Sequence, residues 1–269
     1  MAPLHPMRIT VKSVREKKGR EKIVAVTAYD YPFARMLDET GVDIVLVGDS
    51  LGMVVLGYDS TLPVTMREMI HHTKPVSKAV QNAMVVGDMP FGSYLSENQA
   101  LRSAKRFIQE GGADAVKLEG GKKILKTVKA LVQAGIPVMG HLGMRPQAVS
   151  ELGGYKVQGK LPKQAKEILD DSLRLEQAGV FALVLECVPW RLAEKITKKI
   201  KCPTIGIGAG PKTDGQILVL HDLLGIRSSV RPRFVRRYAD FEKTARQAFR
   251  RYAEDVRSGA YPSLKESFE

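Results

Sequence analysis

Cysteine is scarce in this chain of 269 residues, which contains only Cys187 and Cys202. Both lie in apolar stretches, and a free cysteine commonly packs as a small hydrophobic residue. Two cysteines cannot supply the dense disulfide framework that stabilises small secreted domains. We therefore expect both thiols to be reduced and buried, in a protein of a reducing compartment.

Long hydrophobic runs are also missing. A membrane-spanning helix needs about 20 consecutive apolar residues, and no run in the chain approaches that length. Residues 1–22 contain no apolar segment like the core of a secretory signal peptide. These two observations predict a cytoplasmic protein with no membrane partner.

Acidic residues are fewer than basic ones, with 29 Asp and Glu against 42 Lys and Arg, and the formal net charge is +13. A field of that sign attracts anions, so nucleic acid must be considered. Aromatic residues make up only 6% of the chain and do not alternate with the basic clusters, as they would in a base-stacking surface. We interpret the basic clusters as solvated helix faces and expect no nucleic-acid partner.

Short apolar runs rich in β-branched residues recur along the chain, each ending in a polar or glycine-containing segment. They are residues 23–30, 43–50, 83–90, 114–121, 136–143, 181–189, 202–210 and, more weakly, 216–222. Continuous apolar strands are typical of a parallel sheet covered on both faces. The segments between them have helical spacing of apolar residues, and several end at a glycine in a helix C′ position, namely Gly41, Gly112, Gly135 and Gly179.

Seven or eight strand-then-helix units without a break in composition favour an α/β fold, the closed (β/α)₈ barrel. A doubly wound open sheet is the structural alternative. We predict one barrel domain over residues 1–269, with a basic N-terminal segment at 1–22 and a helical C-terminal extension at 227–269. Two long connections, residues 50–82 and 143–163, are candidate lids, because long loops in compact domains are often functional.

Carboxylates close four of the apolar runs: Asp49, Asp88, Glu119 and Glu186. The C-terminal ends of barrel strands carry the active site, and a charge after an apolar run is costly unless it meets a cation or solvent. Any one of them alone is explained as a solvated cap. The recurrence of four predicts an acidic site at the mouth of the barrel.

Asp49, Asp88 and Glu119 come from three consecutive runs, so in a barrel they can converge on one point. Oxygen ligands without His or Cys suit Mg²⁺, which usually takes one or two carboxylates directly and keeps several waters. We predict a Mg²⁺ site with Asp49 and Asp88 as the favoured direct ligands. Glu119 is expected in the outer coordination sphere of the ion, where it would contact the ion through water.

Lys117 lies two residues before Glu119, so strand alternation places both side chains on one face. A buried lysine needs an anionic partner, and a substrate carboxylate held at the metal would provide one. A purely structural pair with an aspartate is the alternative. Ser50 adjoins Asp49 and could donate a hydrogen bond to the same substrate carboxylate.

Glu186 is the candidate general base, because its apolar surroundings in the sequence LVLECVP favour a carboxyl group suited to proton transfer. By alternation Cys187 points to the opposite face, which argues against a nucleophile paired with Glu186. His141 ends another run and could orient a ligand or titrate near neutrality. A structural histidine is an equally good interpretation.

Several longer motifs resemble the ketopantoate hydroxymethyltransferase family. They occur in family order between about residues 26 and 226 and include VTAYDYPFA, LVGDSLGM, GDMPFGSY, VKLEGG, GHLGMRPQ and LVLECVP. The resemblance implies transfer of a hydroxymethyl group from 5,10-methylenetetrahydrofolate to 3-methyl-2-oxobutanoate. The products would be 2-dehydropantoate, a precursor of pantothenate, and tetrahydrofolate.

The resemblance also implies cofactors, residue roles and assembly. Mg²⁺ is the implied cofactor, methylenetetrahydrofolate the co-substrate, and a homodecamer built as a pentamer of dimers the implied assembly. Glu186 matches the family's proton acceptor. The family's metal and substrate residues match Asp49, Ser50, Asp88, Lys117 and Glu119.

Two other functions remain as alternatives. Another Mg²⁺-dependent 2-oxo acid lyase or mutase of the phosphoenolpyruvate-binding barrel type would share the metal-chelated enolate. Those enzymes generally use a reactive cysteine in a lid loop, and none occurs in residues 50–82 or 143–163. A basic barrel that only binds RNA or acidic partners would leave the four strand-end carboxylates unexplained.

Overall fold

The computed structural model describes residues 8–149, 153–154, 156–226 and 232–269. The chain divides into two compact units, Met1–Val219 and Leu220–Glu269. Parts of three predicted segments lie outside the described residues: the N-terminal segment, the second candidate lid and the C-terminal extension. Every described helix is too short or too polar to span a bilayer.

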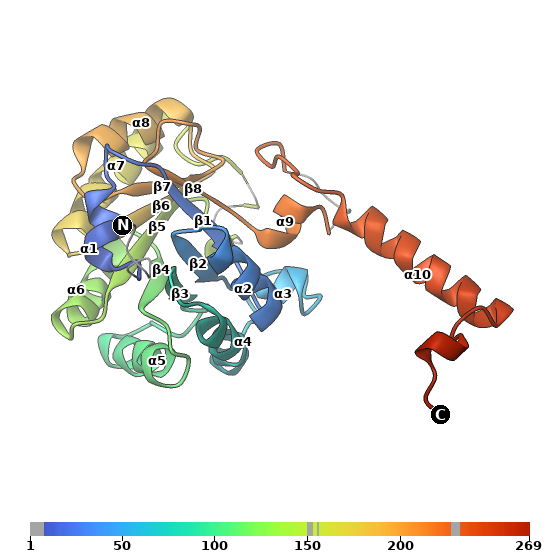
Figure 1. The fold of residues 1–269 in the computed structure, drawn as a ribbon. Coiled ribbons are helices and arrows are strands. Elements are labelled where there is room, and N and C mark those ends of the chain that lie inside the picture. The colour runs from blue at the N-terminus through green and yellow to red at the C-terminus, as the bar shows by residue number, and fades with distance from the viewer. Residues whose placement is uncertain (1–7, 150–152, 155, 227–231) are drawn as a thin grey trace, which may run out of the picture. The chain divides into compact units, whose positions relative to one another are not determined.

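Eight parallel strands close into a barrel in the first unit (Figure 1). They pair in chain order, and pairing of β8 with β1 completes the closure. The strands are β1 (Ile23–Thr27), β2 (Ile44–Val47), β3 (Met84–Asp88), β4 (Ala115–Glu119), β5 (Val138–Gly143), β6 (Ala182–Glu186), β7 (Thr204–Ile207) and β8 (Gly215–Leu218). This confirms the predicted (β/α)₈ barrel and excludes the open doubly wound sheet. Most of the predicted runs are longer than the strands because they included the loops that follow.

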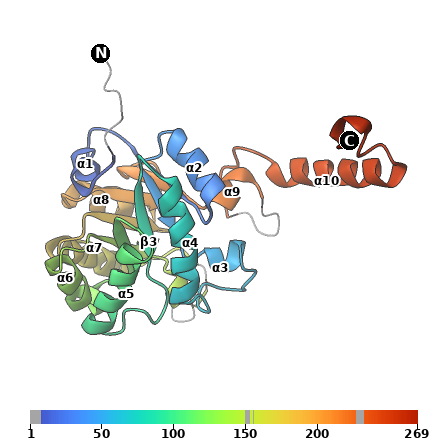
Figure 2. The same ribbon diagram turned by 60° about the horizontal axis from the view of Figure 1, so that its bottom comes forward.

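Helices alternate with the strands and cover the outside of the barrel, as the turned view shows for α4 to α7 (Figure 2). In the first unit they are α1 (Val11–Glu16), α2 (Tyr31–Glu39), α3 (Leu51–Val54), α4 (Met66–Ala79), α5 (Glu97–Gln109), η1 (Lys122–Ile124), α6 (Leu125–Gln133), η2 (Pro146–Ala148), α7 (Pro162–Gln177) and α8 (Trp190–Lys199). The second unit contains α9 (Leu220–Leu224), α10 (Phe241–Ser258) and η3 (Leu264–Glu266).

Helix ends follow the local chemistry of the sequence. Side chains of Asp30, Thr65 and Ser96 accept backbone N–H groups at the starts of α2, α4 and α5, which satisfies donors that a helix leaves unpaired. The predicted C′ glycines have φ values of 79°, 75°, 80° and 101°. These left-handed conformations favour glycine and end the helices before the next strand begins.

The barrel interior is apolar towards the N-terminal ends of its strands. Inward residues such as Ile23, Met84 and Phe181 form one buried cluster there, and Val14 of α1 belongs to it. Helix α1 therefore closes the bottom of the barrel. Because apolar side chains fill this end of the barrel, inward polar residues lie at the opposite end, where the strands finish.

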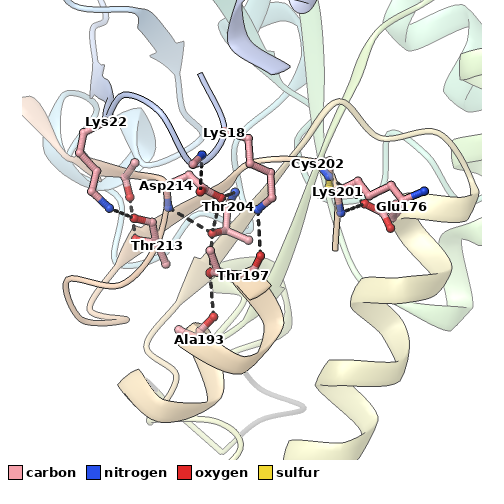
Figure 3. Close-up of polar contacts among 12 residues, drawn as sticks. Lys18, Lys22, Glu176, Ala193, Thr197, Lys201, Cys202, Thr204, Thr213 and Asp214 are labelled. Atoms are coloured by element: carbon pink, nitrogen blue, oxygen red, sulfur yellow. Dashed lines mark hydrogen bonds and ion pairs between the residues drawn. The ribbon is translucent and has the colours of Figure 1, made fainter. Parts of the chain in front are cut away.

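A hydrogen-bonded network holds the chain together around the starts of β7 and β8 (Figure 3). Asp214, just before β8, accepts a bond of 2.7 Å from Lys18 Nζ and one of 2.9 Å from the Thr204 backbone N–H. Lys18 Nζ also donates to the Thr197 carbonyl at 2.9 Å. The Asp214 carboxylate thus connects Lys18 to β7, and Lys18 in turn bonds to α8.

Candidate active site

Strand register places charged residues side by side at the mouth of the barrel. Asp88 on β3 pairs with Lys117 on β4, and Glu119 on β4 pairs with His141 on β5. Glu186 ends β6. These positions continue the inward alternation of each strand beyond the apolar layers. The structure therefore brings the predicted carboxylates to the end of the barrel where active sites lie.

Lys117 is the centre of the buried ion pairs. Its Nζ lies 2.7 Å from Asp88 Oδ1 and 3.7 Å from Glu119 Oε1. Asp49 follows β2 in the loop before α3, and its backbone N–H donates to Asp88 Oδ2 at 3.3 Å. All four side chains are almost completely buried. The Lys117–Asp88 pair that the sequence left as an alternative is thus present in the structure.

The charges in this cluster do not balance, because three carboxylates share one ammonium group. Burial, followed by repulsion from Asp88 and Glu119, raises the pKa of Asp49 well above its usual value. Burial also raises the pKa of Asp88, although Lys117 opposes the shift. For Lys117 burial works against the charged form, but attraction by the carboxylates prevails and raises its pKa. The cluster would therefore be stabilised by a further cation.

His141 lies between two carboxylates. Its Nδ1 is 3.3 Å from Glu119 Oε1, and its Nε2 is 3.2 Å from Glu186 Oε2, both within ion-pair distance. Burial and the charge of Lys117 disfavour protonation of His141, but Glu119 and Glu186 outweigh them and raise its pKa to about 9. His141 thus links the acidic cluster to Glu186, whose own side chain remains 14% exposed.

Gln147 on η2 is a central residue that the sequence reasoning missed. Its Nε2 donates to Asp49 Oδ2 at 2.8 Å and to the Met89 carbonyl at 2.9 Å, and its backbone N–H donates to Glu119 Oε2 at 3.1 Å. The hydroxyl of Tyr94 in turn donates to Gln147 Oε1 at 2.5 Å. No local pattern signals this role, because the partners lie 28 to 98 residues apart in the chain.

Ser50 is placed beside Asp49 as predicted, at the start of α3. Its hydroxyl lies 2.8 Å from the hydroxyl of Tyr29, a second residue that the sequence reasoning did not identify. Tyr29 is buried, so its hydroxyl is a fixed neighbour for Ser50. The pair leaves Ser50 able to offer one further hydrogen bond to a group in the barrel mouth.

Cys187 directly follows Glu186 and has an unusual backbone, with a φ of 46°. Such a conformation costs a residue with a side chain about 1–3 kcal/mol. The turn is fixed by a bond of 2.8 Å from the Cys187 N–H to the Ile207 carbonyl. Burial, and then the charge of Glu186, raises the pKa of the Cys187 thiol to about 12. The thiol is therefore a poor nucleophile.

A cavity of about 110 Å³ lies over this cluster and is lined by the predicted residues Asp49, Ser50, Asp88, Lys117, Glu119, His141 and Glu186. Among the residues that the structure describes, no three His, Cys, Asp or Glu side chains are arranged to hold a metal ion by themselves. Mg²⁺ commonly takes only one or two carboxylates and completes its shell with water and substrate. The cavity suits a small acid and a cation together.

The closed parallel barrel, with buried charges converging where its strands end, defines the chain as an enzyme of the (β/α)₈ class. Residues 8–264 match the family described as ketopantoate hydroxymethyltransferase. The chain therefore belongs to the ketopantoate hydroxymethyltransferase family, as its motifs predicted.

Relatives of known name agree with this assignment. The 3-methyl-2-oxobutanoate hydroxymethyltransferase of Thermoanaerobacter sp. is 59% identical over 254 residues, which are 94% of this chain and 92% of the relative. The enzyme of the same name from Carboxydothermus hydrogenoformans is 56% identical over 263 residues, 97% of this chain and 95% of the relative. These similarities support hydroxymethyltransferase activity and do not favour the lyase or mutase alternative.

Among solved structures, a phosphonopyruvate hydrolase in complex with oxalate and Mg²⁺ has a TM-score of 0.62 and 14% sequence identity. The match covers 95% of this chain and 92% of that chain. At this identity the likeness shows a shared barrel fold.

Proposed function

We propose that the protein transfers a hydroxymethyl group from 5,10-methylenetetrahydrofolate to 3-methyl-2-oxobutanoate in pantothenate biosynthesis. Water supplies the hydroxyl oxygen, and the products are 2-dehydropantoate and tetrahydrofolate. The observation that carries the proposal is the cavity in which Asp49, Asp88 and Glu119 face Glu186. It combines a site for a cation and an acid with a carboxylate suited to removing a proton.

Mg²⁺ is the cofactor that this donor set fits. The donors are carboxylate oxygens, the choice of a hard divalent cation, and Asp49, Asp88 and Glu119 are buried together with one lysine among them. The solved phosphonopyruvate hydrolase, a similar barrel, is a complex with oxalate and Mg²⁺. Asp49 and Asp88 would hold the ion, with Glu119 behind them. Bound there, Mg²⁺ would supply positive charge that offsets the negative charge developing on the substrate when its proton is removed.

The chain's own residues would divide the remaining work. Ser50 and Lys117 would bind the substrate carboxylate, with Lys117 held by its bond of 2.7 Å to Asp88. Glu186 would take the proton from C3 of the substrate, oriented by His141 at 3.2 Å. Water would release the one-carbon unit of the folate as formaldehyde, with both of its carbon–nitrogen bonds broken and the nitrogens protonated. C3 would then add to the formaldehyde carbon, whose oxygen becomes the new hydroxyl group. Gln147 would keep Asp49 and Glu119 in fixed positions, so that the site is ready before substrate arrives.

The proposal extends to assembly and location. The family resemblance suggests a homodecamer built as a pentamer of dimers. An amphipathic helix, α10, supports self-association, because Phe249, Tyr252 and Val256 are 70%, 60% and 45% exposed and follow one another at helical spacing. Two free cysteines agree with a cytoplasmic protein.

Purified protein provides the test. We expect 2-dehydropantoate to form from 3-methyl-2-oxobutanoate only when Mg²⁺ and methylenetetrahydrofolate are both present, with the product identified by mass spectrometry. A matched reaction with EDTA and a reaction without folate are the controls. Absence of 2-dehydropantoate under the complete conditions would contradict the proposed function.

A further inference from the structure

A second and larger pocket opens beside the metal-site cavity. It has a volume of about 360 Å³ and shares Glu119 with that cavity, while Gln147 and Tyr94 form part of its wall. Gln147 is the residue bonded to both Asp49 and Glu119. The two spaces therefore meet at the acidic cluster, so a molecule in the larger pocket would lie next to the reacting atoms.

The outer wall of this pocket is unusually apolar for an exposed surface. Phe91 and Leu95, in the connection between β3 and α5, line the pocket and are 54% and 79% exposed. Ile124 of η1 adds a buried apolar surface. Large apolar side chains left in water around a concavity are typical of binding sites. An exposed aromatic ring such as that of Phe91 can stack on a planar partner.

Two basic residues complete the lining. Lys123 on η1 and Arg145, just after β5, both line the pocket, and Lys123 is exposed while Arg145 is half-buried. The pocket therefore combines a reacting centre at one end, an apolar and aromatic wall, and cations that can bind carboxylates.

We propose that this pocket binds the reduced folate, with its ring system against Phe91 and its glutamate carboxylates near Lys123 and Arg145. This inference rests on the proposed function and assigns the co-substrate's site. A folate has the matching chemistry, since it is a planar heteroaromatic ring system and a benzoyl group that ends in an anionic glutamate. The one-carbon unit would then lie towards Glu119, beside the C3 atom of the keto acid that loses its proton.

The keto acid fits this pocket poorly. 3-Methyl-2-oxobutanoate carries its charge next to its keto group and has only a small branched apolar end. It would therefore leave most of a wide aromatic surface without contacts. The smaller cavity of about 110 Å³, which holds the acidic cluster and Lys117, suits it better. Each substrate thus has a pocket of its own chemistry, and the two pockets meet at the reacting atoms.

Substitutions in the larger pocket separate the two substrates. We expect Phe91→Ala to raise KM for methylenetetrahydrofolate about tenfold, since loss of an aromatic contact and its buried area is of that order. Lys123→Ala should raise it about threefold, and less when the co-substrate is methylenetetrahydropteroate, which lacks the glutamate. KM for the keto acid should stay within about twofold of the unsubstituted protein, since neither Phe91 nor Lys123 lines the smaller cavity.

Matched controls lie nearby in the chain. Lys122 is exposed and adjacent to Lys123 but does not line the pocket, and Phe268 is a fully exposed aromatic residue of the second unit. Lys122→Ala and Phe268→Ala should leave both KM values unchanged. Circular dichroism and thermal unfolding would verify that every variant is folded.

Exchange of the C3 proton of the keto acid with deuterium, measured without folate, reports on the smaller cavity alone. Unchanged KM for methylenetetrahydrofolate in both Phe91→Ala and Lys123→Ala would overturn the folate site while leaving the proposed function intact. If these variants raise KM for the keto acid and lose the exchange, the keto acid would be placed in the larger pocket. That result would also overturn the folate site. Failure of the unsubstituted protein to make 2-dehydropantoate would instead contradict the proposed function.

Discussion

Each of the buried charges in the barrel mouth has a neighbour that explains its position. Lys117 neutralises Asp88 at 2.7 Å, and His141 separates Glu119 from Glu186. Asp49 has an amide as its side-chain partner, that of Gln147, and its pKa is raised well above normal by burial and by the other carboxylates. Among single residues, Asp49 therefore has a neutral amide as its side-chain partner where Asp88 has a lysine, and a bound cation would offset its charge.

The separation of roles between Glu186 and Asp88 can be tested by amide substitutions. Glu186→Gln removes the proton acceptor but leaves the acidic cluster intact, so kcat should fall about 10²- to 10⁴-fold while Mg²⁺ affinity measured by calorimetry is nearly unchanged. Asp88→Asn should weaken Mg²⁺ binding about tenfold or more. Near-normal turnover of Glu186→Gln would remove Glu186 from the role of base.

The Cys187 thiol gives a prediction about pH. Its pKa is raised to about 12 in the folded protein, whereas an unfolded cysteine titrates near 8.5. The folded thiol is thus protonated at pH 8, and alkylation should be slow and should accelerate about tenfold per pH unit up to pH 11. Mass spectrometry after iodoacetamide treatment measures the rate, with urea-unfolded protein as the control. Rapid alkylation of native Cys187 at pH 8 would contradict the raised pKa.

The raised pKa of Cys187 also affects the stability of the fold. Because the unfolded chain loses the thiol proton above about pH 8.5 and the folded chain keeps it to about pH 12, this group stabilises the fold less as pH rises through that interval. Cys202 changes stability with pH in the same direction, because burial, followed by the charge of Glu176, raises its pKa to about 12. Cys202 is buried as the sequence predicted, whereas Cys187 is only partly buried, so the prediction of two buried thiols was wrong for Cys187.

Among the secondary-structure elements, the C-terminal ends of the strands form the candidate active site, whereas their N-terminal ends stabilise the barrel. The ends of β3, β4, β5 and β6 present charged residues to the site. The starts of β7 and β8 are tied to the N-terminal segment through Asp214, Lys18 and Thr204 (Figure 3). In barrels of this class residues at the N-terminal end of the strands serve stability.

We therefore expect Asp214→Asn to lower the free energy of unfolding by about 2–3 kcal/mol, because Lys18 and the Thr204 N–H lose part of a buried charged partner. Urea unfolding measures the change, and kcat should be unaffected. Glu110→Gln is the matched control, since the Arg106–Glu110 pair is largely exposed and should contribute no more than about 0.5 kcal/mol. Equal effects of the two substitutions would show that Asp214 is not the anchor described.

The sequence predicted the elements well because their signals are local. Apolar runs marked the strands, and the helix C′ glycines have the left-handed backbone that their spacing indicated. The strand-end carboxylates could be found in the same way. Gln147 and Asp214 could not, since their roles depend on partners that only the closed barrel brings near, such as Asp49 and Lys18. The position of Lys117 was predicted, but its partner Asp88 depends on the register of β3 against β4.

At the scale of the whole molecule, two properties point beyond a single barrel. The formal net charge is +13, which would help to attract the two anionic substrates proposed above. In the second unit, α10 has no buried residue although its sequence is amphipathic. An apolar helix face of this kind normally packs against something, and the proposed homo-oligomer supplies a second copy of the chain.

A charge placed on this face tests the assembly. Phe249→Glu together with Tyr252→Glu should reduce the mass measured by light scattering during size-exclusion chromatography, because burying two carboxylates in an apolar interface is costly. Gln247→Glu is the control, since residue 247 lies on the other side of α10. An unsubstituted protein that runs as a monomer, or a double variant with unchanged mass, would contradict self-association through α10.

The central claim is that the acidic barrel mouth removes the C3 proton of 3-methyl-2-oxobutanoate with the help of a divalent cation. Deuterium exchange at C3, followed by proton NMR in D₂O without folate, measures this step directly. We predict rapid exchange with Mg²⁺, loss of exchange in EDTA, and recovery when Mg²⁺ is restored. Exchange that proceeds equally in EDTA, or that does not occur with Mg²⁺, would contradict the assignment of the site.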